Sequence, residues 1–229
     1  MTTNVRRLAG GYLLGLLAAL AYAEAAADST TDLSVERIFH DNEFELNEPV
    51  SSQWLADGAS YTTIEESTST PDGFDIVQHD SATGEEGILV DASRLVPDNA
   101  EKPLEIKDYS WSDDGQFMLI STNTVKFRRY EPLSDYWLLN LDDWNLRQIG
   151  TVAEPSTLMY AKFSPDSEYI AYMYANNIYV ESVDGNSVKA MTTDGSDLIV
   201  NGTGDWVNEE EFGLRDGFKW SPDSQRLCY

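Results

Sequence analysis

Apolar and polar residues alternate in short segments along this chain, and one turn pattern recurs between them. The pattern is an aromatic residue followed by Asp and then by Gly or Ser. Because Asp with Gly or Ser favours a tight turn, each copy is predicted to end one strand at its aromatic residue and to start another. The leading aromatic residues are spaced by 57, 52 and 57 residues. The four copies are Trp54-Leu55-Ala56-Asp57-Gly58, Trp111-Ser112-Asp113-Asp114-Gly115, Phe163-Ser164-Pro165-Asp166-Ser167 and Trp220-Ser221-Pro222-Asp223-Ser224.

The segments that follow these turns have the residue pattern of β-strands. Six Trp and twelve Tyr residues suit such sheets. No segment after the N-terminal leader has a sustained helical period. A second strand is predicted at 117–120, 169–172 and 227–229, and a third strand at 75–78, 136–139 and 178–180.

Repetition at this length is typical of the blades of a β-propeller. We therefore predict an all-β fold: a partial β-propeller of about four blades, each a four-stranded antiparallel sheet, preceded by an N-terminal signal helix. The leading aromatic residues are expected to pack between sheets. A β-sandwich with coincidental turns is the competing interpretation. Since an open set of blades leaves sheet edges and faces uncovered, we expect this chain to be the front part of a longer protein.

The N-terminus has the pattern of a targeting segment. Arg6 and Arg7 precede an apolar run from Leu8, and small residues that suit cleavage follow at 21–23 or 25–27. The apolar run to residue 23 has 16 residues, fewer than the roughly 20 needed to span a bilayer. We predict a signal peptide over 1–27, with an uncleaved anchor as the alternative. The propeller domain is assigned to 28–229, with its folded part starting near 35–39, outside the cytoplasm.

The balance of charge restricts the classes of partner. Forty acidic and fifteen basic residues give a formal net charge of −25, which argues against a nucleic-acid partner. The same excess would suit a cationic ligand or a salty medium, and it also favours solubility. One cysteine, Cys228, excludes an intrachain disulfide. With only His40 and His79 as histidines, we expect no metal and no cofactor.

The strongest candidate for chemistry is the segment Asp205-Trp206-Val207-Asn208-Glu209-Glu210-Glu211-Phe212. Consecutive glutamates repel one another, so stability alone rarely favours them. On a helix, neighbouring side chains point about 100° apart, so at most two of the three can converge on one small cation. Two converging carboxylates would accept hydrogen bonds from a primary ammonium group. A solvated acidic surface turn is the plainer interpretation of the same residues.

The residues from Asn201 to Phe212, running into Leu214-Arg215-Asp216-Gly217-Phe218-Lys219-Trp220-Ser221-Pro222-Asp223, resemble the propeller domain of dipeptidyl peptidase IV-type serine peptidases. The family motif is Asp-Trp-Val-Tyr-Glu-Glu-Glu, followed by a Trp-Ser-Pro-Asp turn. The resemblance extends from the family's ordered start at 33–39 to residue 229. It implies an eight-bladed propeller joined to an α/β-hydrolase domain, in an enzyme that releases dipeptides with Pro or Ala in the second position.

The same resemblance implies roles for particular residues. Glu210 and Glu211 match the glutamates that hold the free α-amine of the substrate. Asn208 stands where the family has tyrosine, which leaves the support of the acidic segment in question. Arg128, in Phe127-Arg128-Arg129-Tyr130, matches an arginine that contacts the substrate backbone, and Arg129 is its neighbour. We therefore predict Glu210, Glu211 and Arg128 as substrate-binding residues.

The sequence contains no hydrolytic machinery. It has no Gly-x-Ser-x-Gly motif, and neither histidine has a matching nucleophile. We therefore predict no catalytic residue in this chain and expect the Ser, Asp and His in a C-terminal α/β-hydrolase domain beyond Tyr229. The expected partners are peptides with a free N-terminus, that missing domain and a second copy in a homodimer. The alternative function is a non-catalytic β-propeller that binds peptides or proteins.

Overall fold

The computed structural model describes residues 33–41, 43–44, 51–127 and 131–229. The chain forms two compact units, Met1–Pro49 and Val50–Tyr229. In the first unit, the short helix α2 (Val35–Phe39) begins at Ser34, whose hydroxyl accepts a hydrogen bond from Arg37 N at 3.1 Å, and it buries no side chain. The predicted signal segment 1–27 lies outside the described residues. No helix in the described part of the chain is long and apolar enough to cross a bilayer.

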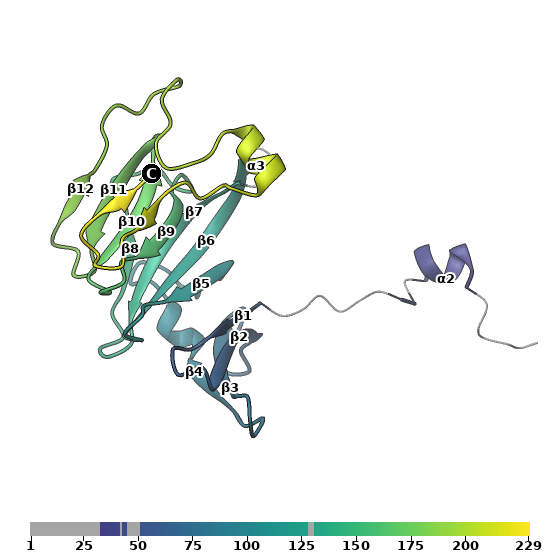
Figure 1. The fold of residues 1–229 in the computed structure, drawn as a ribbon. Helices are drawn as coiled ribbons and strands as arrows, with labels where there is room; N and C mark the ends of the chain where they lie inside the picture. Colours follow the sequence, from purple (N-terminus) through teal and green to yellow (C-terminus); the bar gives the residue numbers. More distant parts are fainter. Residues whose placement is uncertain (1–32, 42, 45–50, 128–130) are drawn as a thin grey trace, which may run out of the picture. The chain divides into compact units, whose positions relative to one another are not determined.

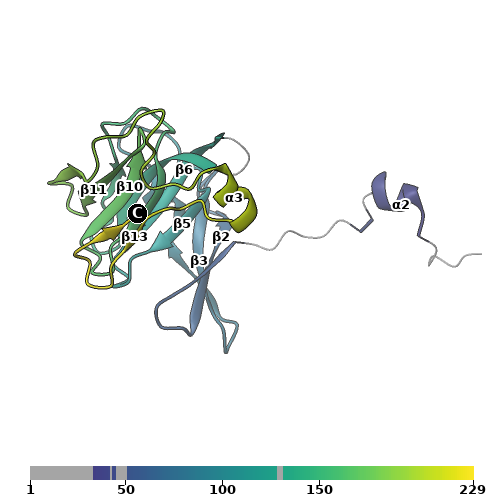
Figure 2. The ribbon, with the colours of Figure 1, turned by 45° about the horizontal axis from the view of Figure 1, so that its top comes forward.

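The second unit consists of antiparallel sheets that follow one another in space in the order of the sequence (Figure 1, Figure 2). Each four-stranded sheet has its strands in chain order, with neighbouring strands paired. The first sheet is β1 (Ser52–Trp54), β2 (Ser60–Glu66), β3 (Phe74–Asp80) and β4 (Glu86–Val90). The second is β5 (Asp108–Trp111), β6 (Phe117–Phe127), β7 (Glu131–Asn140) and β8 (Leu146–Ile149). The third is β9 (Met159–Phe163), β10 (Tyr169–Tyr174), β11 (Asn177–Ser182) and β12 (Val188–Ala190), and a hairpin of β13 (Lys219–Trp220) and β14 (Leu227–Cys228) completes the set.

This arrangement confirms the predicted all-β partial propeller. Three repeats form four-stranded sheets, whereas the fourth contributes a two-stranded hairpin among the described residues. Two short helical elements stand outside the sheets of this unit: the 3-10 helix η1 (Ala92–Leu95) and the helix α3 (Trp206–Phe212). The sheets form a series in which each packs on the next, which excludes the two-sheet sandwich.

The recurrent turn has the same hydrogen bonds in each of its last three copies. In the second repeat, Ser112 Oγ donates to Asp114 Oδ1 at 2.6 Å and accepts from Phe117 N at 2.9 Å. Asp114 Oδ1 also accepts from Gln116 N at 3.0 Å. The residue after Asp is in the left-handed region in each copy, as glycine or serine at a tight turn allows. Equivalent bonds form at Ser164 with Asp166 and at Ser221 with Asp223, and the left-handed residues are Gly115, Ser167 and Ser224.

Successive turns are also joined to one another. The N–H of Asp114 donates to Ser167 Oγ at 3.3 Å, and the N–H of Asp166 donates to Ser224 Oγ at 3.0 Å. Both serines are almost fully buried. The Ser that replaces Gly at the last position of the turn therefore links each blade to the preceding one. This is a second role for a residue that the sequence identifies only as a turn former.

Apolar cores fill the spaces between consecutive sheets. Alternate residues of β6 point to opposite faces, so Met118 and Ile120 enter the first core while Leu119 enters the second. The first core, between the first two sheets, includes Ile76, Val90, Leu95, Tyr109, Met118, Ile120 and Leu139. The second includes Leu119, Tyr136, Leu138, Ile149, Leu158, Ile170 and Tyr172, and the third, under the hairpin, includes Met159, Ala171, Met173, Ile178 and Phe218.

The four leading aromatic residues end the first strands β1, β5, β9 and β13, as predicted. Trp111, Phe163 and Trp220 each pack against one of the three cores. Trp54 does not, because its side chain is 62% exposed and no other described sheet faces it. The expectation that all four pack between sheets is therefore wrong for Trp54.

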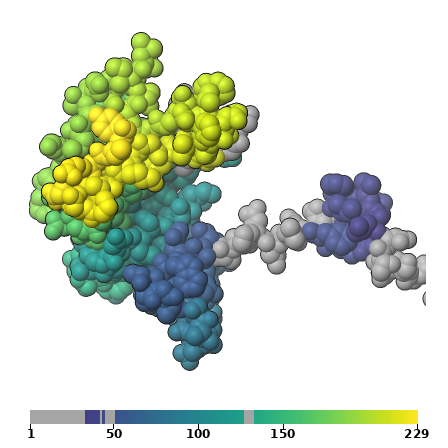
Figure 3. All heavy atoms as spheres, in the orientation of Figure 1, coloured from purple at the N-terminus to yellow at the C-terminus, as the bar shows by residue number. Residues whose placement is uncertain are grey.

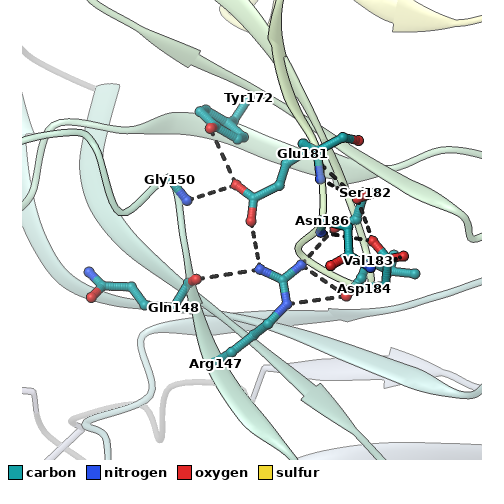
Figure 4. Close-up of polar contacts among 10 residues, drawn as sticks. Arg147, Gln148, Gly150, Tyr172, Glu181, Ser182, Val183, Asp184 and Asn186 are labelled. Carbon is teal, nitrogen blue, oxygen red and sulfur yellow. Dashed lines mark hydrogen bonds and ion pairs between the residues drawn. The ribbon is translucent and has the colours of Figure 1, made fainter.

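An ion pair with a buried carboxylate joins the second and third sheets (Figure 4). Arg147 on β8 donates from Nη1 to Glu181 Oε1 on β11 at 2.6 Å and from Nη2 to the carbonyl of Val183 at 2.9 Å. The other oxygen, Glu181 Oε2, accepts from Gly150 N at 3.0 Å and from the Tyr172 hydroxyl at 3.4 Å. Burial, together with the Glu181 carboxylate, raises the pKa of Tyr172, so this hydroxyl stays a donor. Glu181 is thus a buried carboxylate with several donors.

Removing the guanidinium should test this inter-sheet contact. Arg147→Met leaves Glu181 buried without its cation, and we expect the free energy of unfolding in urea to fall by about 3 kcal/mol. The double variant Arg147→Met/Glu181→Gln should recover at least half of the loss, because the amide still accepts from Gly150. As a control, Lys102→Met removes the exposed pair with Asp72 and should cost less than about 1 kcal/mol. Equal losses in the Arg147 and Lys102 variants would contradict the assignment.

The turn aspartates predict an acid-dependent stability. Desolvation acts to raise the pKa of Asp166, but hydrogen bonds from Ser164, Glu168 N–H and Ser224 outweigh it and lower the pKa. A carboxyl whose pKa is lower in the folded state stabilises the fold above its unfolded-state pKa of about 3.9, and this contribution is lost as the pH falls through the folded-state value.

Asp166→Asn should therefore lower the free energy of unfolding at pH 7 by a fraction of a kcal/mol, since the carboxylate is exposed. The difference from the unaltered protein should close below about pH 3. Asp98→Asn serves as the control, at an exposed aspartate whose side chain accepts no hydrogen bond from the described residues, and it should change the free energy of unfolding at neither pH. If Asp166→Asn lowers the free energy of unfolding equally at pH 7 and below pH 3, the loss does not come from the ionised carboxylate.

Candidate functional site

The three glutamates lie on α3. The segments that lead into and out of this helix pair with each other where they join the body of the unit. Thr203 and Asp216 form an isolated antiparallel bridge. Gly217 N donates to the carbonyl of Gly202 at 2.9 Å. These contacts form a two-stranded stem with α3 at its end. Figure 3 shows this segment, in yellow-green, projecting from the body of the unit.

Two glycines allow the stem to close. A side chain at Gly204 would place its Cβ 2.5 Å from the carbonyl oxygen of Leu214. A side chain at Gly217 would place its Cβ 3.0 Å from the backbone of Gly202 and Thr203. Because backbone atoms cannot move aside as a flexible side chain does, this approach requires glycine at 204 and favours glycine at 217.

The ends of α3 are capped by its own sequence. Asp205 is the N-cap, and its Oδ1 accepts from Asn208 N at 2.8 Å and from Asn208 Nδ2 at 2.9 Å. Gly213 ends the helix with φ 63°, and its N–H donates to the carbonyl of Glu209 at 3.2 Å. A seven-residue helix is unstable alone, so these caps matter. Asn208, at the position of the family tyrosine, thus supports the acidic segment through Asp205.

The three glutamates do not share one environment. Glu209 is 5% exposed, and its Oε1 has no hydrogen-bond partner among the described residues. Glu210 and Glu211 are both exposed, at consecutive positions of the last turn. Carboxylates are unfavourable at the negative end of the helix dipole, and the last turn of α3 contains no basic residue. The local sequence therefore works against the stability of the helix, as is common at binding sites.

The other predicted binding residue cannot be placed. Arg128 and its neighbour Arg129 lie in the connection between β6 and β7, outside the described residues. Their part in the site stays a prediction. Among the residues that the structure does describe, no group of three or more His, Cys, Asp and Glu side chains could hold a metal ion.

The stem is fastened to the third sheet by a lysine that the sequence analysis missed. Lys162 on β9 donates from Nζ to the Asp216 carboxylate and, at 2.9 Å, to the carbonyl of Phe218. Its Nζ also lies 3.8 Å from the centroid of the Phe218 ring. Burial lowers the pKa of Lys162, although Asp216 acts in the opposite direction. Lys162 and Asp216 are 54 residues apart, and no local pattern pairs them.

The outgoing strand of the stem is held in a similar way. Asn201 is buried, and its Nδ2 donates to the carbonyl of Asn176 at 3.2 Å and to Asp194 Oδ1 at 3.0 Å. Asn176 follows β10, so this contact also ties the stem to the third sheet.

In contrast to these contacts of the stem, the helix α3 could have been found from the sequence, because Asp205 and Gly213 are typical N-cap and C-cap residues at the right spacing.

Loss of the N-cap should loosen α3 without unfolding the sheets. Asp205→Ala removes an acceptor for two donors of Asn208, and we expect a local cost of about 1 kcal/mol. Hydrogen exchange of the amides of 206–213 should then accelerate about fivefold, while exchange in β10 stays unchanged. Asp197→Ala removes the same charge from the preceding loop and should affect neither segment. Unchanged exchange in α3 would contradict the capping role.

Comparison with known proteins shows which family the sequence of this chain resembles. The family model described as "Dipeptidyl peptidase IV (DPP IV) N-terminal region" matches residues 112–229. Dipeptidyl peptidase 4 of Felis catus is 36% identical over 127 residues, which cover 54% of this chain and 16% of that protein. Dipeptidyl aminopeptidase B of Saccharomyces cerevisiae is 33% identical over 128 residues, covering 55% and 15%. The chain thus spans about a sixth of the length of these relatives.

A solved structure supports the fold. The crystal structure of Porphyromonas gingivalis dipeptidyl peptidase 4 matches with a TM-score of 0.70 and 24% identity, over 86% of this chain and 27% of that one. The family match covers just over half of this chain and includes α3 and the stem. The chain therefore belongs to the dipeptidyl peptidase IV family and contains part of its N-terminal region.

Proposed function

We propose that this chain is the substrate-binding part of an exported serine-type dipeptidyl peptidase that releases Xaa-Pro or Xaa-Ala dipeptides from free peptide N-termini. In this proposal Glu210 and Glu211 bind the substrate α-amine, and Arg128 contacts the substrate backbone. The observation that carries the proposal is the pair of exposed, adjacent carboxylates on a capped helix that is anchored to the third sheet. The names of the relatives, dipeptidyl peptidase and dipeptidyl aminopeptidase, support the class of reaction.

The chemistry of the pair fits a peptide N-terminus. A primary ammonium has three donors, and two carboxylates offer enough acceptors to satisfy them. The carboxylates repel each other at the negative end of the helix dipole, and a bound cation relieves both effects. An acylated N-terminus carries no such charge and offers the carboxylates no ammonium donor. The site would therefore select free N-termini and fix how far the peptide chain extends beyond them.

Neutral variants of the pair test this role directly. Glu210→Gln and Glu211→Gln should each weaken binding of an Ala-Pro-Ala-Ala peptide about tenfold or more, because each removes a charge-assisted hydrogen bond to the ammonium. Isothermal titration calorimetry on this chain measures the dissociation constants. Glu101→Gln, at an exposed glutamate in the loop before β5, should have no effect. The acetylated peptide should not bind detectably.

Two outcomes would contradict the role: equal binding of the free and acetylated peptides, or unchanged affinity in both variants.

The class of protein is tested separately on the full-length polypeptide that contains this chain. It should release Xaa-Pro dipeptides and lose that activity to a serine-directed fluorophosphonate. Binding without any release would instead identify a non-catalytic peptide-binding propeller.

A further inference from the structure

Five of the seven residues of the helix α3 are exposed. Glu209 is its one buried residue, whereas the side chains of Trp206 and Phe212 are 63% and 69% exposed. Apolar burial, which holds most helices in place, therefore contributes little here. The position of Glu210 and Glu211 must depend on the stem that joins α3 to the third sheet.

Lys162, on the third sheet, contacts the returning strand of the stem at several points. Lys162 has three contacts with residues 216–218: the Asp216 carboxylate, the carbonyl of Phe218 and the face of the Phe218 ring. The Phe218 ring is itself 1% exposed in the third core. The ammonium therefore links the base of the stem to a rigid part of the fold through a charge-assisted hydrogen bond and a cation–π contact.

The contact extends to both strands of the stem. Asp216 pairs with Thr203 in the isolated bridge, and the adjacent Gly217 donates to the carbonyl of Gly202. Fixing Asp216 thus fixes the outgoing strand as well. Lys219 also approaches Asp216, but at 3.9 Å and with a side chain that is 77% exposed. An exposed ion pair of this kind contributes little, so Lys219 provides a matched control on the same carboxylate.

We propose that Lys162 is a positioning residue for peptide binding: through Asp216 and Phe218 it holds the stem so that Glu210 and Glu211 are presented together to the substrate ammonium. This inference rests on the proposed function of the two glutamates. Without Lys162 the stem would sample more arrangements, and binding would have to order it. Peptide affinity falls as a result, while a hydrolytic step carried out by residues elsewhere keeps its kcat.

The test compares Lys162→Met, Lys162→Arg and Lys219→Met. Lys162→Met should raise the dissociation constant for the Ala-Pro-Ala-Ala peptide about three- to tenfold and accelerate amide exchange in 202–217, with exchange in β10 unchanged. In the full-length polypeptide, KM should rise by a similar factor and kcat should hold. Lys162→Arg keeps the charge and should restore most of the affinity, and Lys219→Met should match the unaltered protein.

Asp216→Asn is the second variant, because it removes the charge from the partly exposed side of the pair and is less disruptive to the core. It should reproduce the loss of affinity seen in Lys162→Met. The positioning role is overturned if Lys162→Met and Asp216→Asn bind the peptide normally while Glu210→Gln does not. If Glu210→Gln and Glu211→Gln also bind normally, the proposed function itself has failed, which separates the two failures.

Discussion

A short helix whose apolar residues are all exposed has little packing to hold its position, and this constraint governs the candidate site. The helix α3 has seven residues, and its single buried residue is Glu209. Caps at Asp205 and Gly213 define its ends, but they do not attach it to the fold. The attachment comes from the stem, through Lys162 on one strand and Asn201 on the other. Placement of the carboxylates is therefore a property of the third sheet as much as of the helix.

The sheets provide the rigid base that such an attachment needs. Three apolar cores join consecutive sheets, and the Ser–Asp turns add one hydrogen bond between each pair of successive repeats from the second onward. The partly buried pair of Arg147 and Glu181 adds a directional contact between the second and third sheets. The third sheet is thus fixed on both sides, by the second sheet and by the final hairpin. The repeated sheets thus support the stem and α3, a segment that occurs once among the described residues.

Most of the fold follows from local sequence, because its determinants repeat. The aromatic residue and Asp of each turn mark where one strand ends and the next begins, and those strands are present. The sequence predicts four strands in a blade, but it does not locate the last strands β4, β8 and β12, because they have only three to five residues, too few for a clear alternation. Trp54 shows the limit of the repeat, since the same residue type is partly buried in later copies and exposed in the first. Glu210 and Glu211 are predicted from the resemblance to the family motif, whereas the pairing of Lys162 with Asp216 depends on tertiary structure alone.

The central claim is that Glu210 and Glu211 bind a peptide ammonium, and it can be tested by observing the two carboxylates directly. Carbon-detected NMR of this chain, with glutamate side chains labelled at the carboxyl carbon, follows each group as a free-amine Ala-Pro peptide is added. The account predicts shift changes at Glu210 and Glu211 that saturate with the peptide and are absent with its acetylated form. Saturating changes confined to other glutamates, with both of these resonances unmoved, would contradict it.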